Sequence, residues 1–251
     1  MRDYDILARA ADRCDIVSVD LFDTIVLRDL SCERRRFDAI ARLGSEKLTE
    51  AGWRLPSETL FRSRREVQLI AYRAQAVERP SGDVRLANIL AVQAKLLGLP
   101  PRCVALLREA EVEWEARTLR GNVRLRDQLG ELAQKGKRII AISDTYHDAG
   151  TLWEILNAVL THHPIATIYA SADRDATKKA GSLYFDVVRS EGVAPHRIVH
   201  CGDDRHADLI MARQAGLQAV WLRRPRPAAA ARKLDGLAFR LSHTDMHWEP
   251  A

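Results

Sequence analysis

The sequence predicts an α/β protein in which a parallel sheet is covered by helices and interrupted once by an all-helical insertion. Residues 15–21 are apolar and rich in Val and Ile, which is typical of a buried strand. The stretch from residue 33 to residue 120 has helical periodicity throughout, whereas strand-like and helix-like segments alternate after Gly121. Because strands that alternate with helices are joined by right-handed crossovers, we expect the strands to lie parallel in one sheet.

Composition narrows the class of protein further. The chain has 251 residues, of which 47% are hydrophobic and 29% are charged, and this balance excludes a wholly disordered protein. No apolar run is long enough to span a bilayer, and the first residues lack the basic start and apolar core of a secretory signal. The four cysteines form no Cys-x-x-Cys pair, which argues against a zinc site or a disulfide framework. We therefore expect a cytoplasmic location and no membrane partner.

Positive charge is concentrated in one segment. The formal net charge is +5, and the whole excess falls within residues 28–120. A basic segment can attract an anionic substrate, a nucleic acid or a membrane surface, although an Arg/Glu-rich helical surface exposed to water is the ordinary alternative. Because the sequence contains no nucleic-acid motif and no basic run interleaved with aromatic residues, we expect no nucleic-acid partner.

Start and stop signals define the elements of the first half. An amphipathic helix over residues 2–13 precedes the first strand. Pro56 and Ser57 begin the second helix of the insertion, and Gly98 ends the third. The insertion is predicted to hold helices at residues 33–51, 56–78, 83–97 and 101–119.

The second half supplies the remaining strands. Strands are predicted at residues 137–142, 165–170, 197–201 and 218–222, and helices at 122–135, from 148, at 181–192 and at 206–216. The chain is thereby divided into an α/β core of residues 1–27 and 121–224, a helical insertion of residues 28–120 and a tail of residues 225–251. The start of this tail is rich in Pro, Ala and Arg, and we expect it to be loosely packed.

Polar side chains follow the predicted strands in a recurring way. Ligands of open parallel sheets bind at the carboxyl ends of the strands, near the point where the strand order reverses. The residues at or near these ends are Asp20, Asp23 and Thr24, then Ser143 and Asp144, then Lys178 and Lys179 before a helix, and finally Asp203, Asp204 and Asp208.

This order resembles the haloacid dehalogenase (HAD) superfamily of phosphohydrolases and phosphotransferases. The family's first motif is similar to Val17–Thr24, its second to Ile140–Asp144, and its fourth to Val199–Asp203 followed by Asp208. For the third motif, the spacing to the fourth favours Lys178 over its neighbour. The resemblance implies a Rossmann-like HAD core with a parallel sheet and an all-helical cap inserted after the first strand.

The resemblance also implies roles for these residues. Asp20 would attack the phosphorus of a small phosphorylated substrate, and Ser143 and Lys178 would bind the phosphoryl oxygens. The carboxylates of Asp20 and Asp203 and the backbone carbonyl of Phe22 would hold Mg²⁺. Asp208 would complete this metal site by orienting water or the lysine.

One position departs from the family pattern. Family phosphatases carry an acid/base Asp two residues after the nucleophile, where this chain has Phe22. Dehalogenases of the family have an aromatic residue there and use no metal, but Asp203 and Asp204 keep the acidic pattern that dehalogenases lose. Asp23 either supplies the missing proton shuttle or caps the loop, since on a regular strand it would point away from Asp20.

Three functions follow from these patterns. The leading one is a Mg²⁺-dependent phosphatase-like hydrolase whose basic lid, residues 30–120, overlooks Asp20. The alternative is a catalytically weak phospholigand-binding or partner-docking module, of the kind tied to polysaccharide biosynthesis. A metal-free dehalogenase would leave the acidic cluster around Asp203 unexplained. Other side chains near the strand ends are interpreted as hydrogen-bonded bystanders: Tyr146, His147, His200 and His206.

Overall fold

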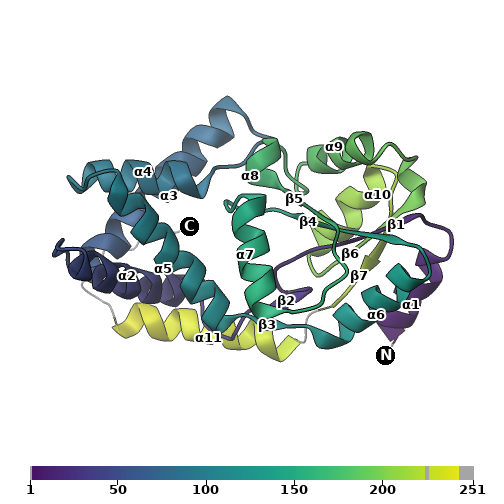
Figure 1. The fold of residues 1–251 in the computed structure, drawn as a ribbon, viewed down its shortest axis with the longest axis horizontal. Helices are drawn as coiled ribbons and strands as arrows, with labels where there is room; N and C mark the ends of the chain where they lie inside the picture. Colours follow the sequence, from purple (N-terminus) through teal and green to yellow (C-terminus); the bar gives the residue numbers. More distant parts are fainter. Residues whose placement is uncertain (1, 224–225, 243–251) are drawn as a thin grey trace.

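A five-stranded parallel sheet forms the centre of the α/β core (Figure 1). The computed structural model describes residues 2–223 and 226–242. The strands lie in the order β5-β4-β1-β6-β7, so the first strand of the chain is in the middle of the sheet. Their bounds are β1 Ile16–Val19, β4 Arg138–Ser143, β5 Thr167–Ala170, β6 Ile198–Gly202 and β7 Gln218–Trp221. The predicted α/β class with a parallel sheet is confirmed.

Helices cover both faces of the sheet, because successive strand residues point to opposite sides. Val17 and Val19 pack with Leu7 in one hydrophobic cluster, whereas Ile16 packs with Tyr184 in another. The first face carries α1 Arg2–Ala11, α6 Val123–Gln134 and α7 Ala149–Val159, and the second carries α9 Ser182–Glu191 and α10 Ala212–Gln214.

The helical insertion has a hydrophobic core of its own, built around Phe37, Phe61 and Leu90. Two short strands, β2 Val26–Leu27 and β3 Arg120–Gly121, pair antiparallel where the chain leaves the α/β core and returns to it. Two-residue strands leave no periodic pattern, so the sequence analysis missed them. The cap boundaries at residues 28 and 120 stay a prediction. The insertion's helices are α2 Glu33–Glu50, α3 Ser57–Glu78, α4 Leu86–Leu96 and α5 Arg102–Thr118.

Some local elements differ from the prediction. The third insertion helix begins at Leu86 rather than at residue 83, because the Asp83 carboxylate accepts hydrogen bonds from the Ser171 hydroxyl and the Val84 amide. A short helix that was not predicted, α8 Ser171–Arg174, follows β5. The helix predicted at 206–216 begins as a π-helix, Arg205–Met211, before it continues into α10. Such π-helical turns are frequent at functional sites.

The start of the tail is not loosely packed. Residues Arg226–Ser242 form α11, which runs beside α2 along the lower edge of the molecule in Figure 1. Phe239 is 1% exposed and belongs to the core of the insertion, and Asp235 accepts hydrogen bonds from the Arg35 side chain and the Cys32 amide, both at 2.9 Å. The expectation is wrong for these residues, while residues 224–225 and 243–251 lie outside the described part of the chain.

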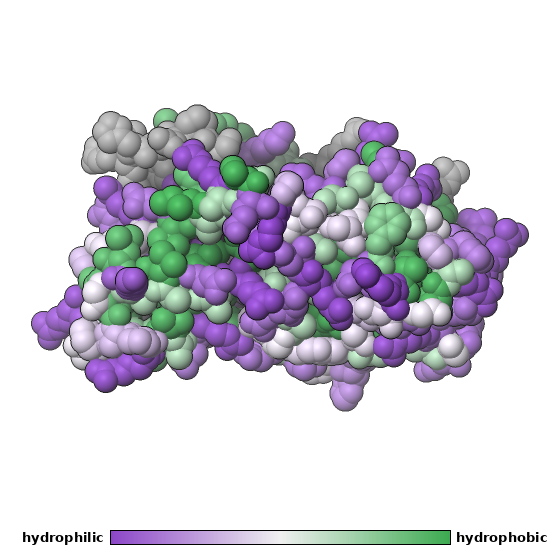
Figure 2. Space-filling view, turned by 90° about the horizontal axis from the view of Figure 1, so that it is seen from above, coloured by the Kyte–Doolittle hydropathy of each residue, from purple (hydrophilic) through white to green (hydrophobic). Residues whose placement is uncertain are grey.

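The insertion also carries exposed apolar side chains. Ile70 on α3 and Val92 and Leu96 on α4 are exposed, and they line a cavity of about 680 Å³ between these helices. Figure 2 shows apolar surface gathered on the side of the molecule that the insertion occupies. Among the described helices, none combines the length and hydropathy needed to cross a bilayer.

The packing of α11 predicts that Phe239→Ala destabilises the protein by about 3–5 kcal/mol, because it opens a cavity in the core of the insertion. Leu237→Ala on the same helix is the matched control, since Leu237 is 56% exposed and its truncation should change the free energy of unfolding by less than about 0.5 kcal/mol. Urea unfolding followed by circular dichroism measures both. Equal stability of the two variants would show that α11 does not support the insertion.

Candidate active site

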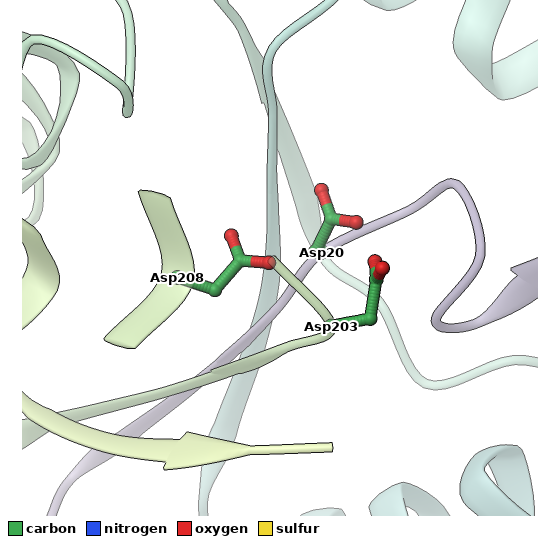
Figure 3. A group of neighbouring side chains, drawn as sticks. All are labelled: Asp20, Asp203 and Asp208. Carbon is green, nitrogen blue, oxygen red and sulfur yellow. The ribbon is translucent and has the colours of Figure 1, made fainter. Parts of the chain in front are cut away.

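Three carboxylates meet at the carboxyl ends of the central strands (Figure 3). Asp20 follows β1, Asp203 follows β6, and Asp208 comes from the π-helix. One oxygen atom from each residue lies within 4.8 Å of the others. The sheet thereby brings together three residues that the sequence motifs placed in the metal site.

Lys178 joins two of these carboxylates. Its ammonium, 3% exposed, donates hydrogen bonds to Oδ1 of Asp20 at 2.5 Å and Oδ1 of Asp208 at 2.7 Å. The backbone amides of Lys178 and Lys179 donate to the carboxylate of Asp144 at 2.6 and 3.0 Å, which fixes the loop. Lys179 itself is exposed, so only the first lysine of the pair reaches Asp20.

Asp208 is held by protein donors on both oxygens. Oδ1 accepts from Lys178 and pairs with Nε2 of His200 at 3.1 Å, and Oδ2 accepts from the Asp204 amide at 2.9 Å. A Cβ at Gly202 would lie 2.2 Å from Oδ2 of Asp208, so only glycine allows this approach. Asp208 therefore positions Lys178, and each of its oxygens is engaged by a protein group.

His200, which the sequence analysis interprets as a hydrogen-bonded bystander, and Ser18, which it does not single out, belong to the same network. They are register partners on β6 and β1, both fully buried, and their side chains hydrogen-bond at 2.7 Å. The imidazole thus connects the interior of the sheet to Asp208. Register between parallel strands could have indicated the pair, but register depends on the whole sheet and cannot be read from either strand alone.

Burial and charge set the protonation of this network. Burial, together with the nearby carboxylates of Asp208 and Asp203, raises the pKa of Asp20 to about 7 against the opposing effect of Lys178. Burial alone would raise the pKa of Asp208, but Lys178 and His200 hold it well below its usual value. Burial alone would lower the pKa of Lys178, but Asp20 and Asp208 hold it well above its usual value. Lys178 is therefore charged. Its single positive charge does not offset the burial of Asp20, so the pKa of Asp20 stays above its usual value.

Two hydroxyl groups lie at the same strand ends. Ser143 is 1% exposed and ends β4, the neighbour of β1. The Thr24 hydroxyl donates toward Oδ2 of Asp20 at 3.4 Å and toward Oδ1 of Asp203 at 3.2 Å. Thr24 therefore ties the loop after β1 to the loop after β6, while the phosphoryl-binding role of Ser143 stays a prediction.

The structure places the two candidate acid/base positions away from free solvent. Phe22 is 8% exposed, and the guanidinium of Arg28 lies 4.0 Å from the centre of its ring. Asp23 has a positive φ of 60°, a conformation that Asp tolerates in turns, and its carboxylate accepts from Arg232 of α11 at 2.7 and 2.9 Å. The Phe22 carbonyl as a metal ligand and Asp23 as a proton shuttle both stay predictions.

The arginines of the insertion that lie near the core are paired with buried glutamates. One oxygen of Glu115 lies 3.7 Å from Arg28 and 3.6 Å from Arg36, and both oxygens of Glu111 accept from Arg64 at 3.3 Å. Glu111 and Glu115 thus pair with three of the insertion's arginines, and the expectation of a basic face over Asp20 stays a prediction.

The arrangement of strands and the helical insertion after the first strand define a haloacid dehalogenase-like hydrolase fold, the class that the sequence motifs predict. No family model and no curated protein matches the sequence. Solved structures do: a 2-haloacid dehalogenase from Pseudomonas syringae pv. tomato DC3000 is similar with a TM-score of 0.56 and 19% identity, over 91% of this chain and 99% of that one.

Two further similar structures contain magnesium. A HAD family enzyme from Bacteroides thetaiotaomicron, in complex with magnesium and inorganic phosphate, has a TM-score of 0.56 and 13% identity, over 84% of this chain and 94% of that one. The HAD-hydrolase YfnB from Bacillus subtilis, bound to magnesium, has a TM-score of 0.52 and 16% identity, over 84% of this chain and 89% of that one. At these identities the likeness shows the fold.

Buried His147 predicts a pH effect on stability. Burial lowers its pKa below the usual 6.5, so below that pH the unfolded chain binds a proton that the folded chain does not. The free energy of unfolding should therefore fall on acidification, and this contribution is at most about 1.4 kcal/mol per pH unit. Urea unfolding at about pH 7.5 and about pH 5.5 should show a smaller loss for His147→Phe than for wild type. Equal losses would exclude His147 as a source of acid lability.

Proposed function

We propose that the chain is a Mg²⁺-dependent phosphohydrolase that cleaves a small phosphorylated metabolite through an aspartyl-phosphate on Asp20. The observation that carries this proposal is the placement of the Asp20 carboxylate between the ammonium of Lys178 and the carboxylate of Asp203. Attack of a carboxylate on phosphorus needs cations beside the negatively charged phosphoryl oxygens, and it needs the carboxylate in its ionised form. A cation bound beside Asp20 would meet both needs.

The donor set fits a magnesium ion. The cluster holds three carboxylates, of which Asp20 and Asp208 pair with the ammonium of Lys178, and carboxylate oxygens are the ligands that Mg²⁺ prefers. Asp20 and Asp203, with the Phe22 carbonyl, would hold the ion, since the oxygens of Asp208 already accept from protein donors. When bound, the ion offsets the repulsion between carboxylate and phosphate and stabilises charge on the phosphoryl oxygens. The magnesium in two similar structures supports this proposal.

The chain's own residues then account for the two chemical steps. An oxygen of Asp20 forms a bond to phosphorus while the bond from phosphorus to the leaving oxygen breaks, and the leaving group departs with the bonding electrons. Lys178 and Ser143 bind the phosphoryl oxygens during this transfer. Water then attacks the aspartyl-phosphate, which releases phosphate and restores Asp20.

Protonation of the leaving group is the weak point of the site. Phe22 has no proton to give, and both oxygens of Asp23 already accept hydrogen bonds from the Arg232 guanidinium, so Asp23 is engaged within the protein. Leaving groups that are stable as anions need no such proton. The site is therefore better suited to good leaving groups, such as acyl phosphates and aryl phosphates, than to simple alkoxides.

The same weakness favours a second candidate function. A protein that binds a phosphorylated ligand without rapid turnover needs the phosphoryl site but no general acid, and Phe22 removes that acid. This candidate is a catalytically weak phospholigand-binding or partner-docking module tied to polysaccharide biosynthesis. Tight binding of a phosphorylated ligand without measurable release of phosphate would favour it.

Asp203→Asn should abolish phosphatase activity and weaken Mg²⁺ binding by at least about tenfold, because a neutral amide cannot balance the ion as a carboxylate does. Calorimetric titration with MgCl₂ measures the affinity. Asp204→Asn is the neighbouring control, since the Asp204 carboxylate accepts from the His206 and Ala207 amides at the start of the π-helix. Unchanged Mg²⁺ affinity in Asp203→Asn would remove this residue from the metal site.

Leaving-group dependence tests the mechanism. Wild type should hydrolyse p-nitrophenyl phosphate measurably and alkyl phosphates poorly, because general acid catalysis is typically worth about 10²–10⁴ in rate. Phe22→Asp should raise the alkyl phosphate rate selectively, whereas Asp23→Asn should lower stability through the lost Arg232 pair and leave the ratio of the two rates unchanged. A selective loss on alkyl phosphates in Asp23→Asn would show instead that Asp23 is the acid.

Asp20→Asn is the decisive control for both experiments. It keeps the shape of the side chain and removes the nucleophilic carboxylate, so phosphate release should fall to background. Phosphate release that is the same in wild type and Asp20→Asn would refute the proposed function. Halide release from a 2-haloacid that is insensitive to chelator would assign the fold a dehalogenase chemistry instead.

A further inference from the structure

The insertion and the α/β core are joined by two chain crossings that lie side by side. The first crossing follows β2 and the second leads into β3, and these two strands pair with each other. Both crossings lie beside α11 at the lower edge of the molecule in Figure 1. Two bodies joined through neighbouring crossings at one edge can rotate about that edge, because only a few residues there need to change conformation.

Three backbone groups of the first crossing are bonded to side chains of α11. The guanidinium of Arg232 donates to the carbonyl oxygens of Asp29 at 2.9 Å and Arg28 at 3.0 Å. The carboxylate of Asp235 accepts from the Cys32 amide at 2.9 Å. A segment acts as a hinge only when its backbone dihedrals are free to change, so these bonds stiffen the crossing.

The same helix holds a loop of the core and the interior of the insertion. Arg232 also donates to both oxygens of Asp23 in the loop after β1, at 2.7 and 2.9 Å. Seven residues further along α11, Phe239 is buried in the core of the insertion, where its ring centre lies 6.2 Å from that of Phe61. Rotation of the insertion away from the core would therefore break the pair with Asp23 or pull Phe239 out of its cluster.

The contacts of the insertion with α8, at the opposite edge, are polar. The loop between α3 and α4 meets α8 at the upper edge of the molecule in Figure 1. There the Ser171 hydroxyl donates to Asp83 at 2.6 Å, and an exposed ion pair joins Arg79 to Asp175 at 2.6 Å. Exposed ion pairs contribute little to stability, because water replaces them at small cost. The edge at α8 is therefore the one that separates more easily.

We propose that α11 is a brace that holds the insertion against the α/β core, and that release of this brace lets the insertion rotate away at the edge formed by α8. The side chains of Arg232 and Asp235 are partly exposed, so water can replace their bonds without unfolding of the sheet. None of the contacts that the structure describes for α11 involves Asp20, Lys178 or Asp203. The brace therefore does not depend on the proposed function.

Amide hydrogen exchange of the full chain, followed by NMR, tests this brace at the edge near α8. The Leu86 amide of the insertion donates to the Tyr146 carbonyl of the core at 2.7 Å, so its exchange reports separation of the two parts. The amides of β1, in the middle of the sheet, report unfolding of the core.

The double substitution Arg232→Ala/Asp235→Ala removes the bonds to the crossing and to Asp23. Exchange of the Leu86 amide should become at least about tenfold faster, because hydrogen bonds to charged groups are among the stronger ones. Neither substitution removes a bond of this amide, so a purely local effect would leave its exchange unchanged. Thermal unfolding confirms that the variant is folded. If it does not fold, Asp235→Ala alone should still accelerate the Leu86 amide, since it keeps the pair with Asp23.

Two control variants separate release of the brace from loss of stability. Lys233→Ala removes a charge from an exposed position of α11 and should leave all rates unchanged. Leu129→Ala opens a cavity beneath α6 in the α/β core and should accelerate the amides of β1 without accelerating Leu86.

Two results would overturn the proposal. Wild-type exchange of the Leu86 amide in the brace variants would show that α11 does not hold the insertion in place. Acceleration of the Leu86 amide in Leu129→Ala by the same factor as the β1 amides would show that the insertion separates from the core only when the whole chain unfolds.

Discussion

The arrangement of the strand ends depends on the ion pairs that the buried ammonium of Lys178 makes with the carboxylates of Asp20 and Asp208. A lysine that is 3% exposed is stable only when it is paired, and three carboxylates within 4.8 Å repel one another unless a cation separates them. Lys178 meets both needs by bonding to Asp20 and Asp208. Its place is set in turn by Asp144 at the end of β4, which binds the amides of the lysine loop. Asp20 is therefore positioned by elements on both sides of β1.

A chain of buried hydrogen bonds that begins inside the sheet holds the side chains of the site in place. Ser18 fixes the ring of His200, His200 pairs with Asp208, and Asp208 holds Lys178. Each member is buried, so each hydrogen bond is made in surroundings where its loss would leave a polar group unpaired. A hydrogen-bonded chain of this kind keeps Lys178 in place before any ligand binds, as the proposed function requires of its cation.

The sequence predicted those features of the fold and site that depend on short-range patterns. Strand periodicity and motif order placed Asp20, Ser143 and Asp203 at one edge of a parallel sheet with Lys178 near them, and the structure brings the first three to neighbouring strand ends and the side chain of Lys178 to Asp20. The features that the sequence did not predict depend on contacts between segments that lie far apart along the chain. The helix α11 packs on the insertion through Phe239, and no local sequence pattern predicts that this side chain is buried. The pairing of Arg232 with Asp23 connects the tail to the loop after β1.

The pairing of charges is a second feature that cannot be predicted from the sequence alone. The insertion holds the whole net positive charge of the chain, yet the arginines nearest the core face Glu111 and Glu115, two acidic residues on one face of α5. Net charge describes a segment, whereas attraction of an anion depends on which charges remain unpaired at one surface. Glu111 and Glu115 pair with three of the insertion's arginines, so the segment's net charge does not tell where a positive surface lies, and the cation that the structure places against Asp20 is Lys178 of the core.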